Sequence, residues 1–434
     1  MKTWLTLIAA TAFSFSYQAQ ANSFKTEHWQ TTNGAQVVFY QAMEVPMLDI
    51  NVAFAAGSAY DGKQFGLSAL TTELLNQGNG NLDANQIADK LADTGAQYEG
   101  ETSRDMIMLH LKTLSSEQAL AQAIEALSLI INKPTFQYDA FTREKNQQLV
   151  TITQQQESPD EVANMAFFNK LYNTHPYAHA INGTQESVKN ITLTQVRDFY
   201  KRYFVGDNMY IVIVGAVNSD KAHQLAEQLT QNMPKGQAAP SIVKAVPLSA
   251  AEKVAISYPS SQTMLRLGQV GIDHAVPDYF PLVVGNYVLG GGTLVSRLAY
   301  EVREKRGLTY GVVSQFMPMP GDGPFLISLS TKNSEANNAL QVTEETLKGF
   351  LLNGPNEEEL TAAKQYMTGS FPLSLASNSS IANMLLRIAF YHLPDDYLDT
   401  YTARIEAVTT EEIKQAFDTH IQLDKMLLVT VGQV

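Results

Sequence analysis

The sequence predicts an α+β protein built from two tandem homologous domains, and two observations support this prediction. Segment 424–434 (DKMLLVTVGQV) repeats segment 207–217 (DNMYIVIVGAV) at a separation of half of the 434-residue chain. Before each copy, the hydrophobic pattern indicates a strand, helices, strands and helices in the same order. Each half is therefore expected to be an α/β sandwich, with helices covering one face of a sheet.

The first-half elements follow from hydrophobic periodicity. Segment 47–56 (MLDINVAFAA) alternates apolar and polar residues, which indicates a strand. Leu67, Leu70 and Leu74 have helical spacing and indicate a helix over 66–75. The same reasoning predicts further strands at 36–41, 105–112 and 209–214, and further helices at 85–93, 118–132, 141–156 and 194–203.

The second half repeats this order after a segment rich in proline. Residues 233–248 contain three prolines and one glycine without periodicity, which predicts a linker between domains 22–232 and 249–434. Strands are expected at 264–270, 310–316, 323–330 and the final segment. Helices are expected at 279–289, 297–305, 335–352, 357–369, 381–391 and 410–417.

The first 21 residues have the pattern of a secretory signal peptide. Lys2 supplies a basic start, an apolar run follows, and Ala19-Gln20-Ala21 matches a cleavage site. No later stretch is long and apolar enough to span a membrane. We therefore expect export to the periplasm of a Gram-negative bacterium.

The amino-acid composition argues against several kinds of binding partner and site. The formal net charge is −13, and this argues against nucleic acid or an anionic membrane surface as a partner. The chain has no Cys, which excludes disulfides and thiolate metal sites. A hydrophobic content of 45% is typical of a globular protein.

Two parts of the sequence carry recognisable motifs. The first half has Gly57-Ser58 and then Phe65-Gly66-Leu67 at the start of a helix. The second half reads GTLVSRL at 292–298 and EVREKRGLTY at 301–310. These motifs resemble those of the M16 zinc peptidases, the pitrilysin-like and mitochondrial processing peptidase-like family, and segment 292–310 is the longest match. The resemblance covers the whole mature chain and implies the LuxS/metallohydrolase-like fold of that family.

Active members of the family carry H-x-x-E-H on the first-half helix, where two His bind zinc and the Glu is the general base. In this sequence Ala69 and Glu73 stand at the two His positions, and Thr72 stands at the position of the base. The family's third ligand falls on Thr151 or Val150, counted from a Ser-Pro turn. Zinc needs three protein ligands, so the resemblance implies a degenerate site with no metal on this chain.

The resemblance also implies a role for the second half, which in the family supplies an Arg and a Tyr to the scissile peptide. Arg303 and Tyr310 have the required spacing. A guanidinium can bind a peptide carbonyl, and a Tyr hydroxyl can stabilise the oxyanion that forms. The alternative interpretation is a surface ion pair for Arg303 and an ordinary strand residue at Tyr310. Leu91 stands in the first half where Arg303 stands in the second, which favours a specific task for Arg303.

The leading hypothesis is therefore a non-catalytic, substrate-binding subunit of a heterodimeric periplasmic zinc metallopeptidase. Zinc is expected on an H-x-x-E-H partner, and peptides are the expected substrates. The second hypothesis is a peptide-binding or assembly protein of the same fold, like core subunits of respiratory complexes. A third is a self-sufficient peptidase with a displaced metal site.

Overall fold

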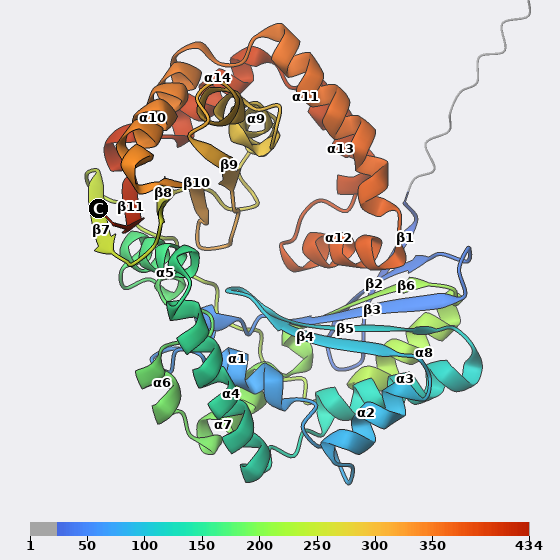
Figure 1. Ribbon diagram of the computed structural model, residues 1–434. Helices are drawn as coiled ribbons and strands as arrows, with labels where there is room; N and C mark the ends of the chain where they lie inside the picture. Colours follow the sequence, from blue (N-terminus) through green and yellow to red (C-terminus); the bar gives the residue numbers. More distant parts are fainter. Residues whose placement is uncertain (1–23, 434) are drawn as a thin grey trace, which may run out of the picture.

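The computed structural model describes residues 24–433, which form two halves that each contain one β-sheet (Figure 1). The first sheet has the strand order β1-β2-β6-β3-β5-β4. Its strands are β1 (Thr26–Gln30), β2 (Gln36–Gln41), β3 (Met47–Phe54), β4 (Gln97–Thr102), β5 (Ile107–Leu114) and β6 (Met209–Gly215). The expected signal peptide, residues 1–21, lies outside the described residues.

The second sheet has the order β7-β11-β8-β10-β9. Its strands are β7 (Glu252–Ser257), β8 (Gln262–Val270), β9 (Thr309–Phe316), β10 (Pro324–Lys332) and β11 (Leu427–Gly432). In both sheets one pair is parallel, β2–β6 in the first and β7–β11 in the second, and the pairs flanking them are antiparallel. The two halves therefore share one topology apart from β1, which confirms the α+β prediction of two homologous domains.

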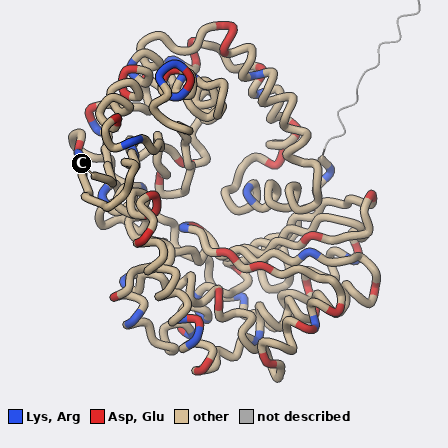
Figure 2. The backbone as a smooth tube through the Cα atoms, viewed as in Figure 1, with Lys and Arg blue, Asp and Glu red and all other residues tan. Residues whose placement is uncertain are grey.

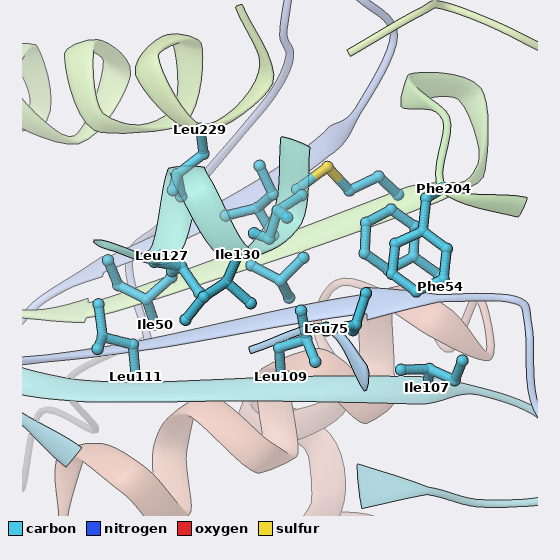
Figure 3. Packing of buried hydrophobic residues seen from close by; sticks show 14 of the residues in the cluster. Ile50, Phe54, Leu75, Ile107, Leu109, Leu111, Leu127, Ile130, Phe204 and Leu229 are labelled. Atoms are coloured by element: carbon cyan, nitrogen blue, oxygen red, sulfur yellow. The ribbon is translucent and has the colours of Figure 1, made fainter. Parts of the chain in front are cut away.

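Helices of the first half cover one face of the first sheet and form its main core (Figure 3). Ile50 and Leu109 from the sheet pack with Leu127 and Ile130 of α3 in this core. The helices are α1 (Leu67–Leu74), α2 (Ala84–Ala92), α3 (Glu117–Asn132), α4 (Tyr138–Gln156), α5 (Pro159–Tyr172), α6 (Gln185–Asn190), α7 (Leu193–Tyr203) and α8 (Ser219–Thr230). Of these, α5, α6 and α8 were not predicted from the sequence.

Helices of the second half are α9 (Tyr279–Asn286), α10 (Ala336–Asn353), α11 (Glu357–Ser370), α12 (Asn378–Phe390), α13 (Tyr397–Ala407) and α14 (Thr410–His420). Two predictions need correction here. The helix expected over 279–289 is α-helical only to Asn286 and continues as a π-helical turn, Tyr287–Gly291. The helix expected over 297–305 is a π-helical turn, Ala299–Glu304. π-Helical turns are rare and frequent at functional sites.

The two halves exchange equivalent helices. Helix α5 belongs to the first half by sequence but packs on β8 and β11 of the second sheet. Helix α12, at the equivalent place in the second half, packs on β3 and β6 of the first sheet (Figure 1). The expectation that helices cover only one face of each sheet is therefore incomplete, because the second face receives a helix from the other half.

Contacts at both exchanged helices are specific. Phe167 of α5 is fully buried, and Gly268 of β8 leaves room for it, since a Cβ there would lie 2.9 Å from the Phe167 ring. At α12, the Asn383 amide oxygen accepts a 2.7 Å hydrogen bond from Asn51 on β3, and Ser379 donates to Asp49 at 2.5 Å. Both halves are thus needed to complete either core.

Residues 231–251 contain no helix or strand and connect the halves. This segment is held along its length by backbone hydrogen bonds, from Gly206 to the Pro234 carbonyl and from Ala245 to the Gly321 carbonyl. His175 contacts the Val243 carbonyl at 2.8 Å. The connection is therefore bound to both halves.

Charged residues are spread over both halves. In the view of Figure 2, Lys and Arg are interspersed with Asp and Glu in both halves. Within residues 24–433, no helix has the length and apolar character needed to cross a membrane.

Candidate functional site

The first candidate site is helix α1, which carries three of the degenerate metal-site positions. The helix starts at Gly66, whose φ of 93° is left-handed and whose missing Cβ leaves room for the Asn182 carbonyl. Its first backbone N–H groups are bound by a buried carboxylate, because Asp61 accepts from Gly66 at 2.7 Å and from Ser68 at 2.8 Å. Helix α1 packs against α4 and the edge strand β4.

The side chains on α1 do not form a metal site. Ala69 is buried and has no donor atom. The Thr72 hydroxyl lies 3.0 Å from the Ser68 carbonyl and 2.7 Å from the Thr102 hydroxyl of β4, so its hydrogen bonds stay within the protein. Glu73 is the one potential ligand, and burial, followed by the neighbouring Glu144, raises the pKa of its carboxyl.

The third predicted ligand position lies on α4. Thr151 donates to the Gln147 carbonyl of its own helix at 3.2 Å, and Val150 is 49% exposed. Neither residue supplies a carboxylate. Across residues 24–433, no group of three or more His, Cys, Asp or Glu side chains is placed to hold a metal ion. The residues present at this site therefore do not fit zinc, which needs three protein ligands.

Sequence reasoning missed a residue that positions these helices. Gln148 on α4 is buried, and its amide donates to the Gly66 carbonyl at 3.0 Å and to the Asn182 carbonyl at 2.8 Å. It therefore ties α4 to the start of α1. In the sequence, Gln148 is one polar residue on a helix that is mostly polar. The structure shows that its side chain faces inward.

Asp61 makes the stability of this region depend on pH. Burial raises its pKa from 3.8 to about 7, although the backbone N–H groups of α1 oppose the rise. Between about pH 4 and pH 7 the folded protein holds a proton on Asp61 that the unfolded chain has released. The free energy of unfolding should therefore fall as pH rises through this window, by up to about 4 kcal/mol.

The measurement is urea unfolding of the wild type and Asp61→Asn at pH 4 to 8. The variant cannot ionise, so we expect its free energy of unfolding to fall less steeply over this range. Parallel pH profiles would show that Asp61 does not carry the dependence.

The second candidate site is the pair Arg303 and Tyr310. Arg303 lies in the π-helical turn Ala299–Glu304, which contacts β9, and its guanidinium forms no hydrogen bond or ion pair with any residue of 24–433. The neighbouring cations differ, since Lys305 and Arg306 both bind Glu301. The surface ion pair considered for Arg303 is therefore absent from the described chain.

Tyr310 is the second residue of the edge strand β9 and is 88% exposed. The equivalent residue of the first half is Tyr98 on the edge strand β4, and each follows a left-handed glycine, Gly95 or Gly307. The two environments are opposite. The Tyr98 hydroxyl is buried, and burial followed by the nearby Glu73 raises its pKa. The Tyr repeats in the sequence, but only Tyr310 offers its hydroxyl to solvent.

The fold and this site together define the class of protein: a duplicated metallopeptidase-type chain whose metal position, as far as residues 24–433 show, lacks the three ligands that zinc needs. A family model described as insulinase (peptidase family M16) matches residues 37–185. A second, described as the peptidase M16 inactive domain, matches residues 190–367. Together the two models cover most of the chain.

Similar proteins agree with these matches. The crystal structure of a peptidase M16 inactive domain from Pseudomonas fluorescens has a TM-score of 0.91 and 38% sequence identity, and covers 94% of this chain and 98% of that chain. The non-peptidase homolog YmxG of Helicobacter pylori is 26% identical over 400 residues, 91% of each chain. The uncharacterized zinc protease YmxG of Bacillus subtilis is 26% identical over 349 residues, 80% of this chain and 84% of that one.

The chain belongs to peptidase family M16. Its relatives include a protein described as a peptidase M16 inactive domain and one described as a non-peptidase homolog. The lack of a zinc ligand set in the first half is compatible with the second description.

Proposed function

We propose that this protein is the non-catalytic, substrate-binding subunit of a heterodimeric zinc metallopeptidase. The observation that carries the proposal is the contrast between the two halves. Within residues 24–433, the first half has no ligand set for zinc, while the second half presents Arg303 without a hydrogen-bond or ion-pair partner and Tyr310 almost fully exposed at a sheet edge. A residue pair kept only for the fold would be expected to contact the rest of the chain.

The chemistry of the pair suits a peptide bond that another subunit cleaves. The Arg303 guanidinium has donors in a rigid fork that can bind a peptide carbonyl. The Tyr310 hydroxyl can donate a hydrogen bond to the oxyanion that develops during hydrolysis. The zinc and the general base would come from an H-x-x-E-H subunit of the same family. We propose that both subunits act in the periplasm, since residues 1–21 have the pattern of a secretory signal peptide.

A second candidate function is a peptide-binding or assembly protein that takes no part in hydrolysis. The description of a relative as a non-peptidase homolog favours it. The two functions differ in what Arg303 does. Hydrolysis in a complex requires the guanidinium, whereas assembly does not.

The test is reconstitution. The purified protein alone should contain no stoichiometric zinc and cleave no peptides, as judged by metal analysis and by fluorogenic peptides. Mixed with a periplasmic H-x-x-E-H subunit from the same organism, it should produce peptide hydrolysis that neither chain shows alone. Stoichiometric zinc and activity in the isolated protein would instead support a self-sufficient peptidase.

A further inference from the structure

A cavity of about 400 Å³ lies where the two edge strands end. Thr102 at the end of β4 lines it from the first half, and Gln315 near the end of β9 lines it from the second. The exchanged helix α5 contributes Asn164 and Phe168. Both halves therefore build this cavity, and it adjoins the degenerate metal position, because Thr102 also contacts Thr72 on α1.

Arg104 brings a positive charge into the cavity. Its Nε donates to the Tyr177 carbonyl at 3.2 Å, and its guanidinium lies 3.8 Å from the centre of the Phe168 ring. One further N–H group points to the His179 carbonyl at 3.5 Å. These contacts fix the plane of the guanidinium and leave donors free.

No carboxylate of residues 24–433 forms an ion pair with Arg104. The carboxylate of the adjacent Asp105 instead accepts hydrogen bonds from the hydroxyls of Tyr177, at 2.6 Å, and Tyr391, at 3.1 Å. Glu161 lines the same cavity without reaching the guanidinium. Burial lowers the pKa of Arg104 to about 10, because a reduced contact with water disfavours the charged form.

A half-buried guanidinium without a counter-ion is unfavourable, and a carboxylate is the group that its planar donors fit best. The remaining lining suits the end of a peptide. Asn164, Asn182 and Gln315 offer amides to a peptide backbone, and Met165 and Met317 offer an apolar surface to a side chain.

We propose that this cavity binds the C-terminal carboxylate of a peptide whose last residue is apolar, with Arg104 as the carboxylate ligand. The proposal rests on the proposed role in peptide binding and adds which end of the peptide is recognised. It concerns binding by this chain alone, so its failure would leave hydrolysis by the two-subunit complex untouched.

The experiment is calorimetric titration of the full protein with N-acetyl-Ala-Ala-Met and with the same peptide amidated at its C-terminus. We expect the free acid to bind about 10-fold more tightly or better, since an ion-paired hydrogen bond is lost in the amide. This comparison needs no variant, and equal affinity for the two peptides, or no binding of the free acid, would overturn the proposal.

Two variants and a third peptide locate the effect. Arg104→Gln should remove the preference for the free acid, and circular dichroism will check that it folds. Glu161→Gln should strengthen binding of the free acid, because it removes a negative charge from the cavity while Arg104 stays in place. An amidated peptide with an internal Glu should bind weakly. If it binds as tightly as the free acid, recognition of the chain terminus is refuted.

Discussion

Arg303→Ala should lower peptide turnover by the two-subunit complex about 100-fold or more, because it removes a donor that acts on the scissile peptide. The guanidinium forms no hydrogen bond or ion pair within residues 24–433, so its loss breaks no contact of the fold. The measurement is the kcat and KM of the reconstituted complex with a fluorogenic peptide, together with the thermal unfolding of the variant alone. We expect lower turnover at unchanged stability.

Lys305→Ala is the matched control, since it removes an exposed charge two residues away that pairs with Glu301 and lies over the Tyr300 ring. It should leave turnover near that of the wild type, because an exposed ion pair of this kind contributes little. Tyr310→Phe removes only a hydroxyl from a side chain that is 88% exposed and should also reduce turnover. Wild-type turnover in Arg303→Ala would contradict the role assigned to this pair.

Phe167→Ala should destabilise the whole chain by about 3–5 kcal/mol, the usual cost of removing a fully buried aromatic ring. Phe167 lies on α5 but packs in the core of the second sheet, beside Met264 and Val429. A cavity there weakens the attachment of one half to the other. Urea unfolding, followed by far-UV circular dichroism, measures the effect.

Asn169→Ala, on the exposed side of the same helix, is the control and should change stability by less than about 0.5 kcal/mol. If the helix exchange couples the halves, Phe167→Ala should shift the unfolding of both together. A variant in which only the first half lost stability would show that α5 is not part of the second core.

The repeat of the final strand predicted the fold because strands and turns are encoded locally. Gly95 and Gly307, each left-handed before an edge strand, show how closely the copies agree. The helix exchange could not be predicted, because periodicity identifies an apolar face but not the sheet that it covers. Strand β4 was missed because GluGlyGlu at 99–101 is polar, as an edge strand with one solvated face allows.

At the degenerate metal site, the absence of the zinc ligands could be predicted from the sequence, because this prediction needs only the residue types at the aligned positions. It could not predict that Arg303 has no hydrogen-bond or ion-pair partner within residues 24–433, because Glu301 is closer in sequence to Arg303 than to Lys305, and Glu304 is adjacent to both. The π-helical turn decides which side chains meet, and hydrophobic periodicity does not distinguish it from an α-helix. Arg104 was also missed. The other residues that line its cavity come from distant parts of the chain, so the sequence does not show that they meet.

We propose that this chain completes the active site of another subunit. The most direct measurement is a titration of a fixed concentration of the H-x-x-E-H subunit with this protein, following peptide hydrolysis. We expect a rate that rises from near zero and saturates at one chain per catalytic subunit, with all zinc on the partner. A rate that does not change as this protein is added would contradict it.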